Sequence, residues 1–308
     1  MEDLTRPFDP DQTHQRHFDC VCDRDYVKHL IKGKLEVLSQ EQDTVFVSPK
    51  VPLRDSDGSP FEGWVIGMRA GKESYRDNFP REIQFLATTS ERHEDINIRS
   101  WYPVCDNGTE VDVTLTAIHE WTNGMEAMLE GTILDGTREI VFFDTRYAAK
   151  KLDYRIGEIY KFKLAAFAYC AELLDKPKMK LTAEQAEEFA RKTGCEIKRD
   201  ARGNAKPMSI DMRDLVACVS RGGAQPDNCE FQSSIRGMEN GSCAFRECLI
   251  FKIACARSDD GKDIEIPLVA RSDFFSRPWP RVGKCIRGIL WMQGHCVSGV
   301  DEHVPESC

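Results

Sequence analysis

The sequence predicts a mainly β protein with α elements (α+β), in which an α/β N-terminal region precedes two similar small β-barrel units. Three observations lead to this fold class. Segments with alternating apolar and polar residues recur, and Asp-Gly pairs typical of hairpin turns separate them at 135–136 and 260–261. Residues around 140–170 resemble those around 266–296. A helix with a strong start signal lies between these two regions.

The N-terminal third divides into an arm and a mixed region. Residues 1–23 are polar, contain two prolines and show no apolar periodicity, so they are predicted to be a flexible arm. Residues 24–41 place apolar side chains at spacings of three and four, which is typical of an amphipathic helix. Three strand candidates follow, at 63–68, 83–88 and 101–104. Residues 24–104 are therefore predicted as the α/β N-terminal region.

Residues 105–180 form the first predicted β unit. Val111, Val113 and Leu115 alternate with polar residues, which indicates a half-buried strand. Further strands are predicted at 125–134, 140–143 and 159–164, with a short helix within 144–154.

Residues 181–224 are predicted to be a helical linker. Thr182 and Gln185 form a capping box, because each side chain can bond to the other residue's free backbone N–H. Gly194 can end this helix in the left-handed conformation. A second short helix is predicted at 210–219, and a Gly- and Pro-containing loop at 220–229.

Residues 225–308 form the second predicted β unit. Its strands are predicted at 230–238, 247–256, 264–269 and 285–293. At an offset of 126 residues, the second unit repeats residues of the first: Arg155 and Arg281, Gly157 and Gly283, Leu164 and Leu290, Cys170 and Cys296. The alternative is a coincidence between two ordinary β regions.

The order of elements is the same in both predicted units. A strand, a hairpin, a strand, a short helix and a strand led by glycine follow one another, and this order is similar to that of the oligonucleotide/oligosaccharide-binding (OB) barrel. The resemblance rests on element order alone, since no sequence motif of a particular family is present. Gly157 and Gly283 would allow the sharp turn into the last strand.

Charge and composition limit the class of protein. The net charge is −9, and all of it lies in residues 1–200, with 28 basic against 37 acidic residues, whereas residues 201–308 hold 14 of each. An anionic ligand is therefore expected to meet the C-terminal third. The chain has no apolar run of about 18 residues and opens with an acidic segment, which predicts a cytoplasmic protein without membrane contact. Most of the 13 cysteines are then expected to be reduced thiols, a disulfide framework being the alternative.

A search for chemical motifs predicts no catalytic residue, no metal ligand and no cofactor. His14, His17, Cys20 and Cys22 are too crowded for a usual zinc site and are predicted to belong to the polar arm. His295 and Cys296 are adjacent on a predicted strand, so their side chains point to opposite faces and cannot share a proton. We expect His295 to be a partly buried strand histidine.

The segment 271–291 is the candidate binding site, because it combines cations with flat aromatic rings. Its predicted ligand-binding residues are Arg277, Trp279, Arg281, Lys284 and Arg287. Single-stranded nucleic acid uses this chemistry through phosphate contacts and base stacking, and it also suits an acidic protein or a carbohydrate. The alternative is structural: Phe274 and Phe275 fill the barrel, Trp291 is core and the cations are merely solvated.

These observations predict a non-catalytic binding or assembly protein on tandem OB-like units. The sequence does not identify its ligand, and a protein partner and an oligomeric ligand are both open. One alternative is a single-stranded nucleic-acid-binding protein that uses residues 271–291. The other is an enzyme with an unrecognised site between the units.

Overall fold

The computed structural model describes residues 42–55, 57–70, 83–90, 93–133, 136–175, 177–193, 195–221, 227–243 and 246–297, and the fold is mainly β. The strands are β1 Gln42–Val47, β2 Val51–Arg54, β3 Pro60–Ala70, β4 Ile83–Ser90, β5 His93–Pro103, β6 Thr109–Glu120, β7 Ala127–Ile133, β8 Arg138–Asp144, β9 Ile159–Leu174, β10 Lys178–Leu181, β11 Met208–Asp211, β12 Ala217–Ser220, β13 Asn228–Cys243, β14 Arg246–Arg257, β15 Asp263–Arg271 and β16 Cys285–Cys296. The helical elements are α3 Tyr147–Lys150, α4 Ala183–Thr193 and the 3₁₀ turn η3 Ser272–Phe274. The predicted arm 1–23, with its four zinc-type side chains, and the helix predicted at 24–41 lie outside the described residues.

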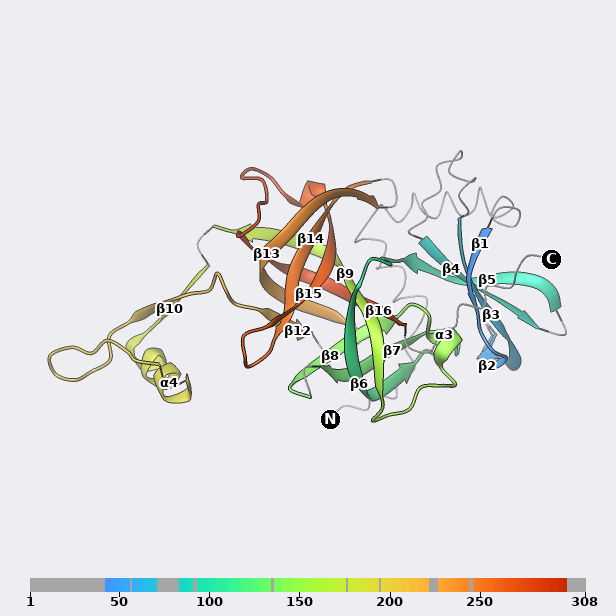
Figure 1. Cartoon of the computed structure of the whole chain (residues 1–308), viewed down its shortest axis with the longest axis horizontal. Coiled ribbons are helices and arrows are strands. Elements are labelled where there is room, and N and C mark those ends of the chain that lie inside the picture. The colour runs from blue at the N-terminus through green and yellow to red at the C-terminus, as the bar shows by residue number, and fades with distance from the viewer. Residues whose placement is uncertain are drawn as a thin grey trace.

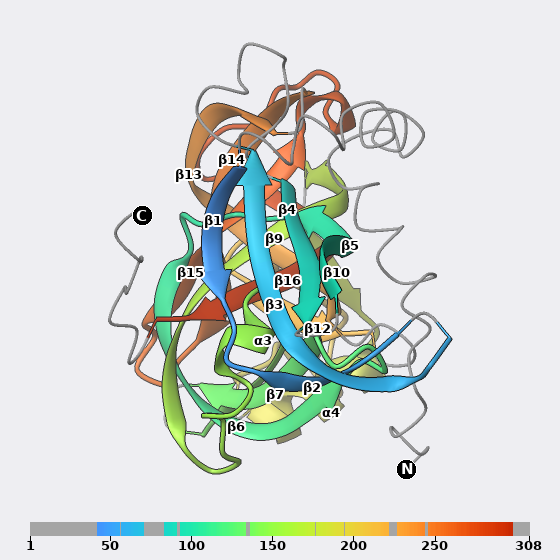
Figure 2. The ribbon, with the colours of Figure 1, turned by 90° about the vertical axis from the view of Figure 1, so that its right-hand side faces the viewer.

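The N-terminal sheet is antiparallel, with the order β1-β3-β4-β5 and with β2 added to β3. The strands predicted at 63–68, 83–88 and 101–104 are confirmed as parts of β3, β4 and β5. Figure 2 shows this sheet facing the viewer, with the rest of the chain behind it.

The remaining large sheet closes a first ring of five strands. β6 pairs with β7, β7 with β8, β8 with β16, β16 with β9, and β9 with β6 again. All of these pairs are antiparallel except β8 and β16, where Phe143 and Gln293 are partners in a short parallel contact.

A second ring of five strands closes in the same way. β13 pairs with β14, β14 with β15, β15 with β9, β9 with β16, and β16 with β13. The single parallel contact is again short, and joins Leu268 and Val269 of β15 to Ala166 and Phe167 of β9.

The two rings share the long strands β9 and β16. These strands run antiparallel from Cys285, opposite Leu174, to Cys296, opposite Phe162, and Met292 lies opposite Ala166 between these ends. Each ring therefore contains one strand from the other half of the chain. The predicted unit boundaries at 105–180 and 225–308 stay a prediction, but neither segment contains all five strands of a ring.

Side chains that alternate along the shared strands separate two hydrophobic cores. One cluster spans the interiors of both rings and includes Phe162, Leu164 and Ala166 of β9. Phe167 points the other way, into a second cluster with Phe143 and Trp291. The period of two that defines a strand thus gives each shared strand an interior face and an outward face.

The N-terminal sheet covers this outward face. Phe85 and Tyr102 are completely buried in the second cluster with Trp291 and Phe143, and the rings of Tyr102 and Phe143 meet edge to face at 4.9 Å. Polar contacts support the layer, because the Gln84 side chain donates to the Thr145 carbonyl over 2.6 Å.

A projecting segment, distinct from the predicted arm 1–23, extends from the rings on the side away from the N-terminal sheet. It consists of the antiparallel pair β10–β11 and helix α4, and Figure 1 shows it at the far end from the N-terminal sheet. The predicted capping box is confirmed: the Thr182 N–H donates to Gln185 Oε1 over 3.0 Å, and the Gln185 N–H donates to Thr182 Oγ1 over 3.3 Å.

The second helix predicted at 210–219 is wrong. Met208–Asp211 pairs with β10, and Ala217–Ser220 pairs with the first part of β13. Met208, Ile210 and Met212 are spaced by two, so the segment fits a strand once a partner strand is present. The loop predicted at 220–229 is shorter than expected, because Ser220 ends β12 and Asn228 begins β13.

The glycines expected to allow sharp turns do so. Gly136 and Gly261 have φ values of +86° and +85°, and Gly157 and Gly283, which lead into β9 and β16, have values of +90° and +83°. A left-handed residue at each position reverses the chain, and glycine adopts it without strain.

We expect the isolated fragment 105–180 not to fold, because its ring lacks β16 and its apolar interior would stay open to water. Circular dichroism and urea titration of the fragment test this, with the full chain as the control. A cooperative unfolding transition in the fragment would contradict the strand exchange.

Candidate ligand-binding surface

The connection between β15 and β16 holds four of the five predicted ligand-binding residues. We call residues Arg277–Lys284 the 277–284 loop. Just before it, Phe275 is only 7% exposed, and its ring meets that of Phe251 edge to face at 5.5 Å. Within the loop, Pro280 is buried. The contact between Phe275 and Phe251 ties the start of the loop to the second ring.

Backbone hydrogen bonds fix the end of the same loop. The Gly283 N–H donates to the Ile235 carbonyl over 2.8 Å, and the Ile235 N–H donates to the Lys284 carbonyl over 2.8 Å. The Lys284 N–H also donates to the Arg281 carbonyl, which closes a turn. The loop is therefore held at both ends, so the side chains between them are presented from a defined backbone.

Trp279 is displayed on the outside of this loop. It is 45% exposed, whereas Trp291, which the structural alternative placed in the core, is completely buried. The structure describes all five tryptophans of the chain, and among them only Trp279 is exposed. Phe275 is buried as the structural alternative expected, but this burial does not extend to Trp279.

The cations of the loop differ from Arg287. Arg277, Arg281 and Lys284 are exposed, and none of them forms an ion pair with another residue in the described part of the chain. Arg287 lies on β16 instead, and its guanidinium contacts the Glu172 carboxylate at 2.6 and 2.7 Å. Among the predicted ligand-binding residues, the cations without an ion-pair partner in the described part of the chain thus all lie on the loop.

A groove of about 870 Å³ is lined by residues of the neighbouring strands β9, β16, β13 and β12. Arg287 stands directly between Gln232 and Glu172 in the strand register, and Phe274 of η3 also lines the groove. Gly288 forms part of its wall, and a side chain would not fit at this position, because a Cβ would lie 2.0 Å from the Cys170 carbonyl oxygen. We call this feature the β12 groove.

The charges around the β12 groove are compensated. Besides the Arg287–Glu172 pair, Arg221 Nε lies 3.5 Å from Glu230 Oε1. Apolar side chains fill the remaining lining, among them the 63% exposed Val219. The groove was not predicted from the sequence, since its walls come from strands far apart in the chain.

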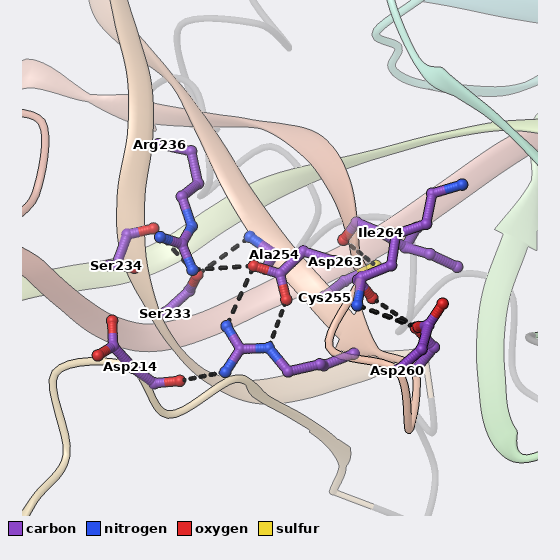
Figure 3. Close-up of polar contacts among 12 residues, drawn as sticks. Asp214, Ser233, Ser234, Arg236, Ala254, Cys255, Asp260, Asp263 and Ile264 are labelled. Atoms are coloured by element: carbon purple, nitrogen blue, oxygen red, sulfur yellow. Dashed lines mark hydrogen bonds and ion pairs between the residues drawn. The ribbon is translucent and has the colours of Figure 1, made fainter.

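A separate charged cluster fixes the hairpin between β14 and β15. Asp263 is held by Arg257, at 2.5 and 3.1 Å, and by Arg236 at 2.8 Å (Figure 3). The hydrogen bond from Arg257 lowers the pKa of Asp263 below its ordinary value, and burial opposes this effect. Because the contacts join three neighbouring strands of one ring, we assign this cluster a structural role.

Another polar cluster lies between the N-terminal sheet and the first ring. Arg69 donates to the Asp106 carboxylate over 2.9 Å, and Arg146 Nη2 is 3.6 Å from the same oxygen. Burial alone would raise the pKa of Asp106, but the hydrogen bonds and charge of Arg69, together with the charge of Arg146, lower it. This cluster joins residues that are far apart in the sequence, so alternation and spacing gave no signal for it.

Asp144 and His295 are the buried ionisable groups of this region. Burial raises the pKa of Asp144 to about 6, although its carboxylate accepts hydrogen bonds from the Tyr154 hydroxyl at 2.6 Å and the Arg146 N–H at 2.9 Å. Burial and the charge of Arg146 lower the pKa of His295 to about 4. His295 lies on strand β16, as predicted, but at 5% exposed it is more deeply buried than the partly buried histidine that was expected.

The described residues contain no cluster of three or more His, Cys, Asp or Glu side chains arranged to hold a metal ion. Within the same residues, no helix combines the length and the apolar character needed to cross a membrane. Comparison with protein-family models gives no match to this chain, and comparison with curated proteins gives none either. The function is therefore inferred from the surface itself.

We expect Asp144 and His295 to have opposite effects on stability between pH 4 and 6.5. The raised pKa of Asp144 adds stability that is lost as pH rises through about 6, whereas the lowered pKa of His295 adds stability that is lost as pH falls through about 4. Each effect is worth at most about 3 kcal/mol.

Asp144→Asn should therefore make the unfolding free energy fall more steeply as pH drops from 6.5 to 4, and His295→Gln should make it fall less steeply. Urea unfolding of both variants and the wild type across this range measures the slopes. Parallel pH profiles for all three proteins would contradict the assignment.

Proposed function

We propose that the chain is a non-catalytic binding protein built from two OB-like β units, and that the 277–284 loop contacts an elongated ligand. The element order of each ring supports the OB-like assignment: three antiparallel strands, a short helical turn and a returning strand led by glycine. The units correspond to 105–180 and 225–308, each completed by a strand from the other.

Matching contacts support an internal duplication. In the first ring, the Gly157 N–H donates to the Leu115 carbonyl over 2.8 Å, and in the second the Gly283 N–H donates to the Ile235 carbonyl over 2.8 Å. The register of the first strand shifts just after Leu115 in one ring and just after Ile235 in the other. A backbone irregularity at the same place beside the same hydrogen bond favours a common origin over coincidence.

The parallel contacts carry the same offset as the sequence comparison. Phe143 of β8 pairs with Gln293 of β16, and Val269 of β15 pairs with Phe167 of β9. Val269 lies 126 positions after Phe143, and Gln293 lies 126 positions after Phe167. This agreement comes from strand register and is independent of residue identity.

The observation that carries the binding function is the exposed Trp279 on a loop held at both ends. Apolar side chains fill the interiors of both rings, so a ligand has to bind on an outer surface. Exposure of the apolar indole ring of Trp279 to water is unfavourable, so binding that buries the ring is favoured. Because the loop already holds the ring in place, binding costs less conformational entropy.

A panel of three labelled probes tests this proposal: an oligothymidylate, heparin and polyglutamate. We expect at least one probe to bind the full chain and to bind Trp279→Ala at least about fivefold more weakly, since aromatic contacts of this kind are worth about 1 kcal/mol or more. Fluorescence anisotropy measures the binding.

Ile156→Ala is the control for loss of an exposed apolar side chain. Ile156 is 57% exposed in the equivalent turn of the first unit, where it corresponds to the 62% exposed Val282 at the offset of 126 residues. This control should bind like the wild type. Failure of all three probes to bind in a manner that depends on Trp279 would overturn the proposed function.

A further inference from the structure

The 277–284 loop is a local concentration of positive charge on an acidic protein. It holds three cations and no acidic residue, whereas the whole chain has a net charge of −9. Within the described residues, Arg277, Arg281 and Lys284 are without ion-pair partners, while Arg287 in the β12 groove is neutralised by Glu172. A polyanion would therefore be attracted to the loop.

Trp279 indicates which class of polyanion fits the loop best. It stands two residues from Arg277 and two from Arg281, between Pro278 and Pro280, which restrict the backbone on both sides. Sulfated sugars and acidic peptides can satisfy the cations, but they lack a flat π face at each repeat. A single nucleic-acid strand supplies phosphates for the cations and unpaired bases for the indole.

The corresponding loop of the first unit lacks both the exposed tryptophan and the excess of positive charge. Asp153 stands at the position of Trp279 and Glu158 at the position of Lys284. Arg155, the counterpart of Arg281, is used internally, because its guanidinium donates to the Leu152 and Tyr154 carbonyls over 2.7 and 2.8 Å. The same backbone turn therefore occurs twice in the molecule, and only the second copy has side chains that suit a phosphate backbone.

Building on the proposed function, we infer that the ligand of the 277–284 loop is single-stranded nucleic acid, with bases stacking on Trp279 and phosphates contacting Arg277, Arg281 and Lys284. Base pairing would hide the faces of the bases, so a duplex would use the cations alone. In the β12 groove the charges of Arg287 and Arg221 are compensated, so phosphate contacts are expected on the loop rather than in the groove.

The test is fluorescence anisotropy of the full chain with a labelled oligothymidylate about 20 nucleotides long, repeated over a series of salt concentrations. With three phosphate contacts, the logarithm of the binding constant should fall with the logarithm of salt concentration with a slope of about −2. Trp279→Ala should weaken binding roughly 5- to 100-fold without changing the slope. Arg281→Ala should reduce the steepness of the slope by about 0.7.

Trp279→Phe should retain part of the affinity, Ile156→Ala should bind like the wild type, and a duplex of matched length should bind more weakly than the single strand. Circular dichroism melting checks that each variant is folded. Equal binding by the wild type and Trp279→Ala, or binding that does not respond to salt, overturns the inference. If heparin or polyglutamate binds through Trp279 and the oligothymidylate does not, the inference fails and the proposed binding function stands. If no probe binds, both fail.

Discussion

The pairing of β9 with β16 is the constraint on which the rest of this structure depends. Both strands belong to both rings, so the side chains on their inner faces contribute to one continuous hydrophobic core. The N-terminal sheet packs against the outer faces of these two strands, where Phe167 of β9 and Trp291 of β16 belong to the second cluster. The same two strands also fix the ends of the connections that precede them. The 277–284 loop owes its position to the start of β16, where Gly283 is bonded to Ile235.

The sequence predicts most individual elements but not the exchange between them. Alternation, Asp-Gly turns and the capping box are local properties, and the strands and the helix that they predict are present between Thr109 and Cys296. The error at 210–219 arose because Met208–Asp211 becomes a strand only through pairing with β10. Self-comparison of the sequence indicates two similar units, but similar units are compatible with each ring using its own last strand. The pairing of β8 with β16 and of β15 with β9, together with that of β9 with β16, distinguishes these cases.

The candidate surface was predictable only in the part that depends on residues adjacent in the sequence. Composition identifies the basic and aromatic segment, because cations and rings are adjacent in the sequence. It does not distinguish the exposed Trp279 from the buried Trp291, since burial depends on the N-terminal sheet, whose residues lie about two hundred positions earlier. Nor does it show that Arg287 is neutralised by Glu172, 115 residues away. The cluster around Asp106 and Asp144 is likewise a product of tertiary packing.

Strand exchange also has a consequence for how the protein is made. β16 is the last described strand of the chain, yet it is needed by both rings and by the layer beneath the N-terminal sheet. A ribosome that has translated everything before Cys285 has therefore produced a nascent chain with two open rings and exposed apolar faces. Cooperative collapse of both rings therefore has to wait until β16 has been translated, so this strand completes the two rings in one step.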